Sequence, residues 1–150
     1  MLYFSNLNIE RYHFMIKRVF LDTNIIIDFL DDKREEHKKV QELIKYLILN
    51  NYSIVISEDM LSTIFYIIKD KKATLEFFRT IIKKWNVVPY GLELIEEAIN
   101  IALEKDLDLE DLLQCLSAKD NGCSVLITKD KKFFNCGIAI STTDGFLQGK

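Results

Sequence analysis

The sequence predicts an α/β fold, a three-layer α/β/α sandwich with a central parallel sheet. Short apolar runs recur along the chain, and segments with helical periodicity lie between them. Runs that are apolar throughout are typical of strands buried on both faces of a parallel sheet, and parallel neighbours need helical crossovers. With 150 residues, of which 49% are hydrophobic, the chain can bury a core of ordinary size, which excludes a disordered or collagen-like protein.

Five apolar runs predict the strands of this sheet. The clearest are residues 18–22, 53–57 and 124–128, each of which is rich in Val, Ile or Leu. Weaker runs at residues 85–89 and 138–141 predict two further strands.

Amphipathic stripes predict the helices that cover the sheet. Apolar side chains follow helical spacing over residues 40–48, 94–102 and 109–116, so each of these segments should pack one face on the sheet. The segment 60–85 is apolar on more than one face and rich in aromatic residues. It packs either entirely into the core or partly against a partner protein.

We expect a single domain over residues 15–150, because no Gly-, Ser- or Pro-rich stretch marks a linker. Residues 1–14 are interpreted as an N-terminal extension that an upstream start codon could have produced. They lack the apolar centre of a secretory signal, and no apolar run reaches the ~18 residues of a membrane span. The prediction is therefore a cytoplasmic protein without membrane contact.

Charge and cysteine content limit how the protein could bind nucleic acid and whether it could contain disulfides. The formal net charge is −3 and the pI is about 5.4, so any nucleic-acid binding must depend on local basic patches. The three cysteines, Cys115, Cys123 and Cys136, form no CxxC pair, and their odd number cannot form a complete set of disulfides. Reduced thiols are the expectation.

Acidic residues follow the predicted strands and begin one predicted helix. The carboxyl ends of parallel strands meet at one edge of the sheet, so these acids should converge there. They are Asp22, Glu58, Asp59, Asp108, Glu110, Asp111 and Asp130. Clustered carboxylates repel one another unless a cation lies among them, and oxygen ligands without His or Cys favour Mg²⁺ or Mn²⁺.

Each acid also has an ordinary structural explanation. Asp22 could end a strand and cap the next helix. Asp108 and Asp111 resemble a capping box at the start of a helix, and Asp130 could lie in a turn. The two acids after residue 57 are typical of a first helical turn. Their joint placement at one sheet edge is what favours a metal site over independent caps.

Other chemistries lack their residues. The sequence has no GxGxxG or GxxxxGK[ST] motif, which excludes the usual dinucleotide and P-loop cradles. The two histidines are His13, in the N-terminal extension, and His37, within a charged run, so a Ser-His-Asp or Cys-His site is not expected. A second aspartate two residues after Asp22, as in phosphoaspartate phosphatases, is also missing.

Three segments in order resemble a known family. Residues 18–25 (RVFLDTNI), 108–114 (DLEDLLQ) and 125–130 (VLITKD), the last followed closely by Phe133 and Phe134, are similar to the motifs of PIN domains. More narrowly, they resemble the VapC-type toxin ribonucleases of bacterial toxin–antitoxin pairs. The resemblance covers roughly residues 16–147.

This resemblance implies a Mg²⁺- or Mn²⁺-dependent endoribonuclease, the toxin of a toxin–antitoxin pair. Metal-activated water would attack an RNA phosphodiester in line and leave a 5′-phosphate. Carried over motif by motif, Asp22, Asp111 and Asp130 would be the catalytic metal ligands. Asp108 and Glu110 would lie near the metal and could also bind it.

The resemblance also implies supporting residues, and here the chain departs from the family. Asn24 and Thr128 would hold carboxylates or metal-bound water in place. Many members carry a glutamate after the second strand, where this chain has Thr63. A hydroxyl cannot supply the missing charge, so metal affinity should fall unless another acid compensates: Glu58, Asp59, Asp108 or Glu110. A catalytically weakened or inactive PIN-like binding module is therefore an alternative, as is a nuclease that acts on structured DNA.

The expected partners are RNA, a cognate antitoxin protein and a second copy of the chain in a homodimer. An acidic pocket needs a basic rim to bind RNA, and Lys129, Lys131 and Lys132, which flank Asp130, are the predicted RNA contacts. Other lysines of the middle segment either extend this rim or are merely solvated. They are Lys69, Lys71, Lys72, Lys83 and Lys84.

Overall fold

The computed structural model describes residues 17–150, whose five strands form one sheet in the order β3-β2-β1-β4-β5. Every neighbouring pair is parallel. The strands are β1 (Arg18–Leu21), β2 (Ser53–Ser57), β3 (Asn86–Val88), β4 (Val125–Ile127) and β5 (Ala139–Ser141). All five predicted strands are present, including the two with weaker sequence patterns.

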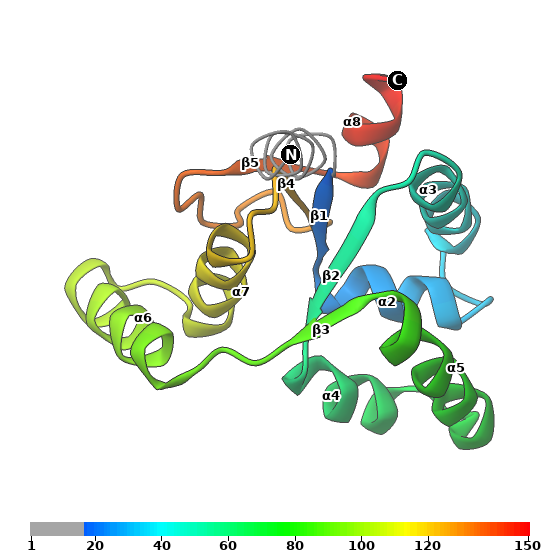
Figure 1. Ribbon diagram of the computed structural model, residues 1–150, viewed down its shortest axis with the longest axis horizontal. Coiled ribbons are helices and arrows are strands. Elements are labelled where there is room, and N and C mark those ends of the chain that lie inside the picture. The colour runs from blue at the N-terminus through cyan, green and yellow to red at the C-terminus, as the bar shows by residue number, and fades with distance from the viewer. Residues whose placement is uncertain (1–16) are drawn as a thin grey trace, which may run out of the picture.

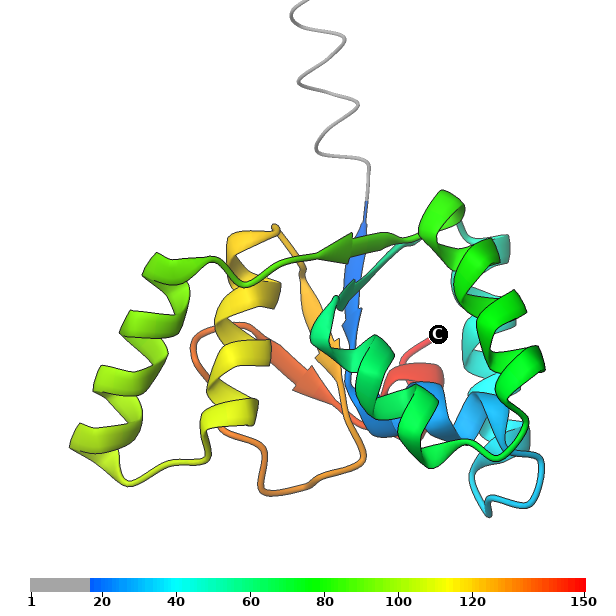
Figure 2. The same ribbon diagram turned by 90° about the horizontal axis from the view of Figure 1, so that it is seen from below.

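Helices cover both faces of the sheet. They are α2 (Thr23–Leu30), α3 (His37–Leu49), α4 (Asp59–Ile67), α5 (Lys71–Lys84), α6 (Leu92–Lys105), α7 (Leu109–Asp120) and α8 (Thr143–Gln148). Figures 1 and 2 show α6 and α7 on one side of the sheet and the remaining helices on the other. The predicted three-layer α/β/α architecture is confirmed.

The strand order places the functional edge beside β1. From β1 the chain builds the sheet outward through β2 to β3, and it then returns to the other side of β1 to add β4 and β5. In open parallel sheets the ligand crevice lies beyond the carboxyl ends of the strands where this direction reverses. Here that point lies between β1 and β4, and the Asp22 N–H continues their ladder by donating to the Ile127 carbonyl at 3.0 Å.

The core explains why β1 is so apolar. Val19, Phe20 and Leu21 have no exposed surface, because β1 is the central strand and is covered on both faces. A smaller apolar cluster joins α6 to α7 through Leu94, Ala98, Leu112 and Leu116. This cluster fixes α7 against α6, and α7 begins at the functional edge.

The middle helices bury one face and expose another. Ile64 of α4 and Ile81 of α5 are buried, whereas Tyr66, Leu75 and Ile82 remain exposed. Of the two explanations for the aromatic-rich segment, complete burial in the core is therefore wrong. Its outer apolar surface is open to solvent.

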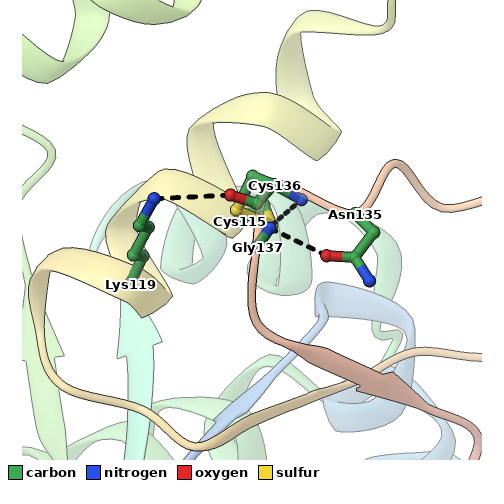
Figure 3. Close-up of a disulfide and its surroundings, with 5 residues drawn as sticks. All are labelled: Cys115, Lys119, Asn135, Cys136 and Gly137. Atoms are coloured by element: carbon green, nitrogen blue, oxygen red, sulfur yellow. Dashed lines mark hydrogen bonds between the residues drawn. A yellow bond between two sulfur atoms is a disulfide. The ribbon is translucent and has the colours of Figure 1, made fainter.

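The prediction of reduced thiols is wrong for two of the three cysteines. Cys115 on α7 and Cys136 in the loop before β5 form a disulfide, while Cys123 is a free, buried thiol. Figure 3 shows the bridge between the helix and the loop. The two cysteines are 21 residues apart, and only the packing of the loop on α7 brings them together.

Two expectations concern the ends and surroundings of the domain. Residues 1–14, the predicted extension, lie outside the described residues, so the domain boundary stays a prediction. Between residues 17 and 150, no helix is both long and apolar enough to cross a lipid bilayer.

Candidate functional site

Asp22 lies at the carboxyl end of the central strand. Its side chain is only 8% exposed, and each carboxylate oxygen accepts one hydrogen bond. Oδ1 accepts from the Thr23 N–H at 2.7 Å, which caps α2, and Oδ2 accepts from the Thr128 hydroxyl at 2.7 Å. Both partners hold the carboxylate in place. Asp22 therefore caps a helix, as the structural alternative predicted, and also faces the functional edge.

Thr128 connects Asp22 to the next acidic segment. Its Oγ1, which donates to Asp22, also accepts from the Asp130 N–H at 3.1 Å. The Asp130 Oδ1 in turn accepts from the Lys132 N–H at 2.9 Å, so Asp130 lies in the turn that follows β4. One buried hydroxyl thus links the backbone around Asp130 to the carboxylate of Asp22.

The first turn of α7 brings the remaining acids to the same edge. Asp108 caps this helix, because its Oδ1 accepts from the Asp111 N–H at 3.0 Å. The cap fixes the direction in which α7 starts and presents Glu110 and Asp111 in its first turn. The positive end of the helix dipole partly offsets their negative charge.

These segments enclose a cavity of about 250 Å³. Side chains from α2, α4, α7 and the loop after β4 line it. They are Asp22, Thr23, Asn24, Ile27, Thr63, Ile67, Glu110, Asp111 and Asp130. Four carboxylates from three separate segments of the sequence therefore share one cavity.

The charges in this cavity act on one another. The pKa of Asp111 is raised from 3.8 to about 6, first by burial and then by the negative charges of Asp108, Asp130, Asp22 and Glu110. Such a shift means that ionising all of these acids together is unfavourable.

Glu110 responds to the same crowding. Its pKa is raised by burial and then by Asp22, Asp59 and Asp108. The ion pairs within residues 17–150 involve Asp28, Asp31, Glu36 and Asp144, so no Lys or Arg side chain neutralises a carboxylate of the cavity. The cavity is a site of uncompensated negative charge.

The donor set fits a hard divalent cation. All its charged ligand atoms are carboxylate oxygens, which Mg²⁺ and Mn²⁺ prefer to sulfur. In the described part of the chain, no three His, Cys, Asp or Glu side chains are already arranged around one ion position. Mg²⁺ does not require such a cage, because it commonly uses one or two carboxylates and fills its other positions with water and substrate phosphate.

The other predicted supporting residues divide into two groups. Asn24 and Thr63 line the cavity, and Thr63 occupies the position expected for a glutamate. Of the four candidates to replace that charge, Glu110 lines the cavity, whereas Glu58 and Asp59 lie at the start of α4, outside the cavity wall, and Asp108 caps α7. Asp59 is still close enough to contribute to the raised pKa of Glu110.

The three predicted RNA-contacting lysines also differ in their surroundings. Lys129 does not extend freely into solvent, because its Nζ lies 3.1 and 3.2 Å from the two carboxylate oxygens of Asp28. Lys131 and Lys132 are exposed. Lys131 lines a second cavity, of about 350 Å³, that shares Asp130 with the acidic one.

Two buried polar residues near the site were not predicted. Gln114 is 1% exposed, and its Nε2 donates to the Thr23 hydroxyl at 3.3 Å and to Glu110 Oε1 at 3.4 Å. Asp28, also 1% exposed, is the partner of Lys129. The available signal was a polar residue within an apolar helical stripe, because Asp28 follows three isoleucines and Gln114 follows two leucines.

Comparisons with known proteins identify the family of this chain. The family model described as PIN domain matches residues 19–137, which include the four carboxylates of the cavity. The chain belongs to the PIN domain family. Like the site residues, the match extends from β1 to the loop after β4.

Two similar proteins are named VapC. The chain is 33% identical to Ribonuclease VapC1 of Aquifex aeolicus over 137 residues, which cover 88% of this chain and 94% of that protein. VapC20 of Mycobacterium tuberculosis, described as a toxin that cleaves the sarcin-ricin loop, has a similar fold. Its TM-score is 0.65 at 15% identity, with 81% of this chain and 96% of that one covered.

A solved VapBC2 structure from Rickettsia felis, bound to a fragment of its promoter DNA, also matches in fold. The TM-score is 0.63 at 17% identity, and the match covers 83% of this chain and 98% of that chain. At such low identity the two solved structures support the fold alone.

Proposed function

We propose that this PIN-domain protein is a Mg²⁺- or Mn²⁺-dependent endoribonuclease and the toxin of a toxin–antitoxin pair, acting in the cytoplasm. The observation that carries the proposal is the cavity in which Asp22, Glu110, Asp111 and Asp130 meet without a basic partner. The 33% identity to Ribonuclease VapC1 supports RNA as the substrate.

In this proposal Asp22, Asp111 and Asp130 hold the metal, with Asp108 and Glu110 beside it. When bound, a divalent cation would lower the pKa of a water molecule and would neutralise negative charge on the phosphate. The chain itself orients the carboxylates: the Thr23 N–H and the Thr128 hydroxyl fix both oxygens of Asp22. The same Thr128 hydroxyl accepts from the Asp130 N–H and sets the start of the Asp130 turn.

RNA would approach over the exposed side of the loop after β4. Lys131 and Lys132 are free to meet phosphates there, whereas the ammonium group of Lys129 is occupied by Asp28. We therefore assign RNA contact to Lys131 and Lys132, and a structural role to Lys129. This assignment revises the three-lysine prediction made from the sequence.

The proposed protein partners are an antitoxin and a second copy of the chain. The solved VapBC2 structure pairs a protein of this fold with a second component, which supports an antitoxin. The exposed apolar side chains Tyr66, Leu75 and Ile82 on α4 and α5 offer surface for either partner.

A cleavage assay with matched substrates tests the proposal. Purified protein is incubated with end-labelled single-stranded RNA, structured RNA and both forms of DNA, with Mn²⁺ or with EDTA. We expect cleavage of RNA in Mn²⁺ only, with products that carry 5′-phosphates. Cleavage of structured DNA in preference to RNA would favour the DNA-nuclease alternative, and binding of RNA without cleavage would favour the inactive module.

Thr63 is the observation behind the inactive-module alternative, and it can be tested by restoring the missing charge. A Thr63→Glu variant adds a carboxylate to the cavity wall, so its Mn²⁺ affinity should rise by about tenfold. Its metal-free form should melt at a lower temperature, because the added charge increases repulsion. Calorimetric titration and thermal unfolding measure the two effects. Thr63→Gln is the control, because glutamine has the shape of glutamate without its charge. Equal Mn²⁺ affinity in the Thr63→Glu and Thr63→Gln variants would contradict the prediction.

The raised pKa of Asp111 predicts a pH dependence. Protons and metal compete for this carboxylate, so Mn²⁺ affinity should increase from about pH 5 to about pH 7 as Asp111, with its pKa of about 6, loses its proton. In the metal-free protein, folding stability should change with pH in the opposite direction to Mn²⁺ affinity. The pKa lies above its ordinary value of 3.8, so the folded state binds this proton more tightly and loses stability as pH rises from about 4 to about 6.

Comparison with an Asp111→Asn variant isolates this titration from all others. The variant should lack the Asp111 step in both the Mn²⁺ titration and the thermal unfolding profile. Its metal-free form should be more stable than wild type at neutral pH, because one repelling charge is gone. Identical pH profiles for the two proteins would show that Asp111 does not titrate in this range.

A further inference from the structure

Gln114 occupies a buried position on α7, one helical turn after Glu110. Its side chain is 1% exposed, and the next two residues of the helix, Cys115 and Leu116, pack into the apolar core. Residues four apart lie on the same face of a helix, so Gln114 and Glu110 are neighbours. An amide at such a depth must find its hydrogen-bond partners inside the protein, because water does not reach it.

The amide nitrogen of Gln114 has two partners, and both line the acidic cavity. Nε2 donates to the Thr23 hydroxyl at 3.3 Å and to Glu110 Oε1 at 3.4 Å. Thr23 is the first residue of α2, and its N–H donates to the carboxylate of Asp22. One buried amide therefore links the first turn of α7, which carries Glu110, to the residue that holds Asp22.

The amide oxygen of Gln114 shows which partner sets the orientation of the side chain. This oxygen, Oε1, is buried and has no hydrogen-bond partner among residues 17–150. A rotated amide would place it against the carboxylate of Glu110, where two acceptors would repel each other. The Thr23 hydroxyl can donate or accept, so it is compatible with either orientation. Glu110 is therefore the group that requires the N–H, and meeting this requirement leaves an acceptor unpaired, which is unfavourable for folding.

Glu110 benefits from such a donor because other acids act on it. Burial and then the negative charges of Asp22, Asp59 and Asp108 raise its pKa, so repulsion favours positions of its side chain that point away from the cavity. The Gln114 amide opposes this movement with a neutral donor, which leaves the charge of Glu110 in place for a cation. Because Gln114 holds only one carboxylate oxygen, the other oxygen stays available as a ligand.

We propose that Gln114 is a positioning residue of the acidic cavity, whose amide holds Glu110 beside Thr23 so that Glu110 contributes to the binding of a divalent cation. Gln114 acts through Glu110 and touches neither the cation nor the RNA. An apolar side chain of the same length would fill the same space on α7 but would release Glu110. The inference rests on the proposed function, because it concerns the metal site of that function.

Calorimetric Mn²⁺ titration of a double-mutant cycle tests the proposal. Gln114→Met keeps the length of the side chain and removes its donor, and Glu110→Gln removes the charge that this donor holds. We expect Gln114→Met to weaken Mn²⁺ binding by about tenfold, as loss of a residue that orients a ligand commonly does. In the Glu110→Gln background the same substitution should change the affinity by less than about twofold, because its target is gone. An equally large effect in both backgrounds would overturn the proposal.

Thermal unfolding and RNA cleavage separate positioning from a general structural role. Metal-free Gln114→Met should unfold close to the wild-type temperature, because the substitution removes an unpaired buried oxygen together with the hydrogen bonds. Its RNA cleavage should be reduced at low Mn²⁺ and largely restored at saturating Mn²⁺. Gln41→Met, at an exposed position of α3, is the matched control and should behave as wild type throughout. Lower stability of Gln114→Met with unchanged Mn²⁺ affinity would show a structural role alone and overturn the proposal.

Nuclear magnetic resonance of the wild-type protein provides a test that does not depend on the folding of Gln114→Met. Added Mg²⁺ should shift the side-chain amide resonances of Gln114, and the shifts should be much smaller in Glu110→Gln. Unchanged Gln114 resonances, at Mg²⁺ concentrations that shift the backbone N–H of Asp111, would overturn the role of Gln114 and leave the proposed nuclease intact. Absence of both Mg²⁺ and Mn²⁺ binding by the wild type would overturn the proposed metal site and, with it, the role of Gln114.

Discussion

An Asp22→Asn variant is expected to remain folded and to lose at least about a hundredfold of its Mn²⁺-dependent RNA cleavage. Asn has the same shape as Asp, so its oxygen can still accept from the Thr23 N–H and its amide can donate to the Thr128 hydroxyl. The helix cap and the link to the Asp130 turn therefore persist. What disappears is the negative charge at the centre of the proposed metal site.

The measurement pairs RNA cleavage with Mn²⁺ titration and circular dichroism. Asp120→Asn is the matched control. Asp120 is exposed at the far end of α7, so this substitution removes the same charge at a position away from the cavity. It should cleave RNA as wild type does. Equal cleavage by wild type and Asp22→Asn would point to a contaminating nuclease and would remove the basis of the proposed function.

A Lys129→Met variant is expected to lose roughly 2 kcal/mol or more of its free energy of unfolding. Lys129 contacts both carboxylate oxygens of Asp28, which is 1% exposed on α2. Removing the lysine leaves a buried carboxylate without its partner, and such a loss usually costs more than the intact pair contributes. The Lys129 side chain is 41% exposed, so solvent moderates the cost.

Urea unfolding measures this effect, and two further variants locate its cause. In Asp28→Asn/Lys129→Met the buried charge is removed along with the lysine, so much of the lost stability should return. Lys131→Met, which alters an exposed neighbouring lysine, should have little effect on stability and should weaken RNA binding instead. If Lys129→Met unfolds as wild type does and only RNA binding falls, then Lys129 is an RNA contact, as its position beside Asp130 first indicated.

Sequence patterns were sufficient for most of the fold because burial leaves a local record. The central strands are covered on both faces, so they are apolar throughout and can be recognised without their neighbours. The acids at the strand ends were predictable for a similar reason, since parallel topology requires those ends to meet. The helix caps at Asp22 and Asp108 could also be predicted from the sequence, because an acid before a helix is a local signal.

Pairings between distant segments left no such record. Lys129 was predicted to contact RNA from its neighbours in the sequence, and only the structure shows that its ammonium group lies beside Asp28, which is 101 residues away along the chain. Cys115 and Cys136 were expected to be reduced thiols, and their bond depends on where the loop after β4 packs. Gln114 belongs to the segment 108–114 that resembles a PIN-domain motif, yet its contacts with Thr23 and Glu110 depend on how α7 packs beside the start of α2.

By itself, the sequence determined the layer order, the parallel sheet and the set of acids available to its carboxyl edge. These follow from periodicity and from topology, which are properties of short segments and of their order. Only the tertiary structure decided which acids share the cavity, that Thr63 lines it while Glu58 and Asp59 do not, and which charges are already paired. The physical reason is that electrostatic and covalent partners are selected by distance in space, and the fold sets that distance independently of separation along the chain.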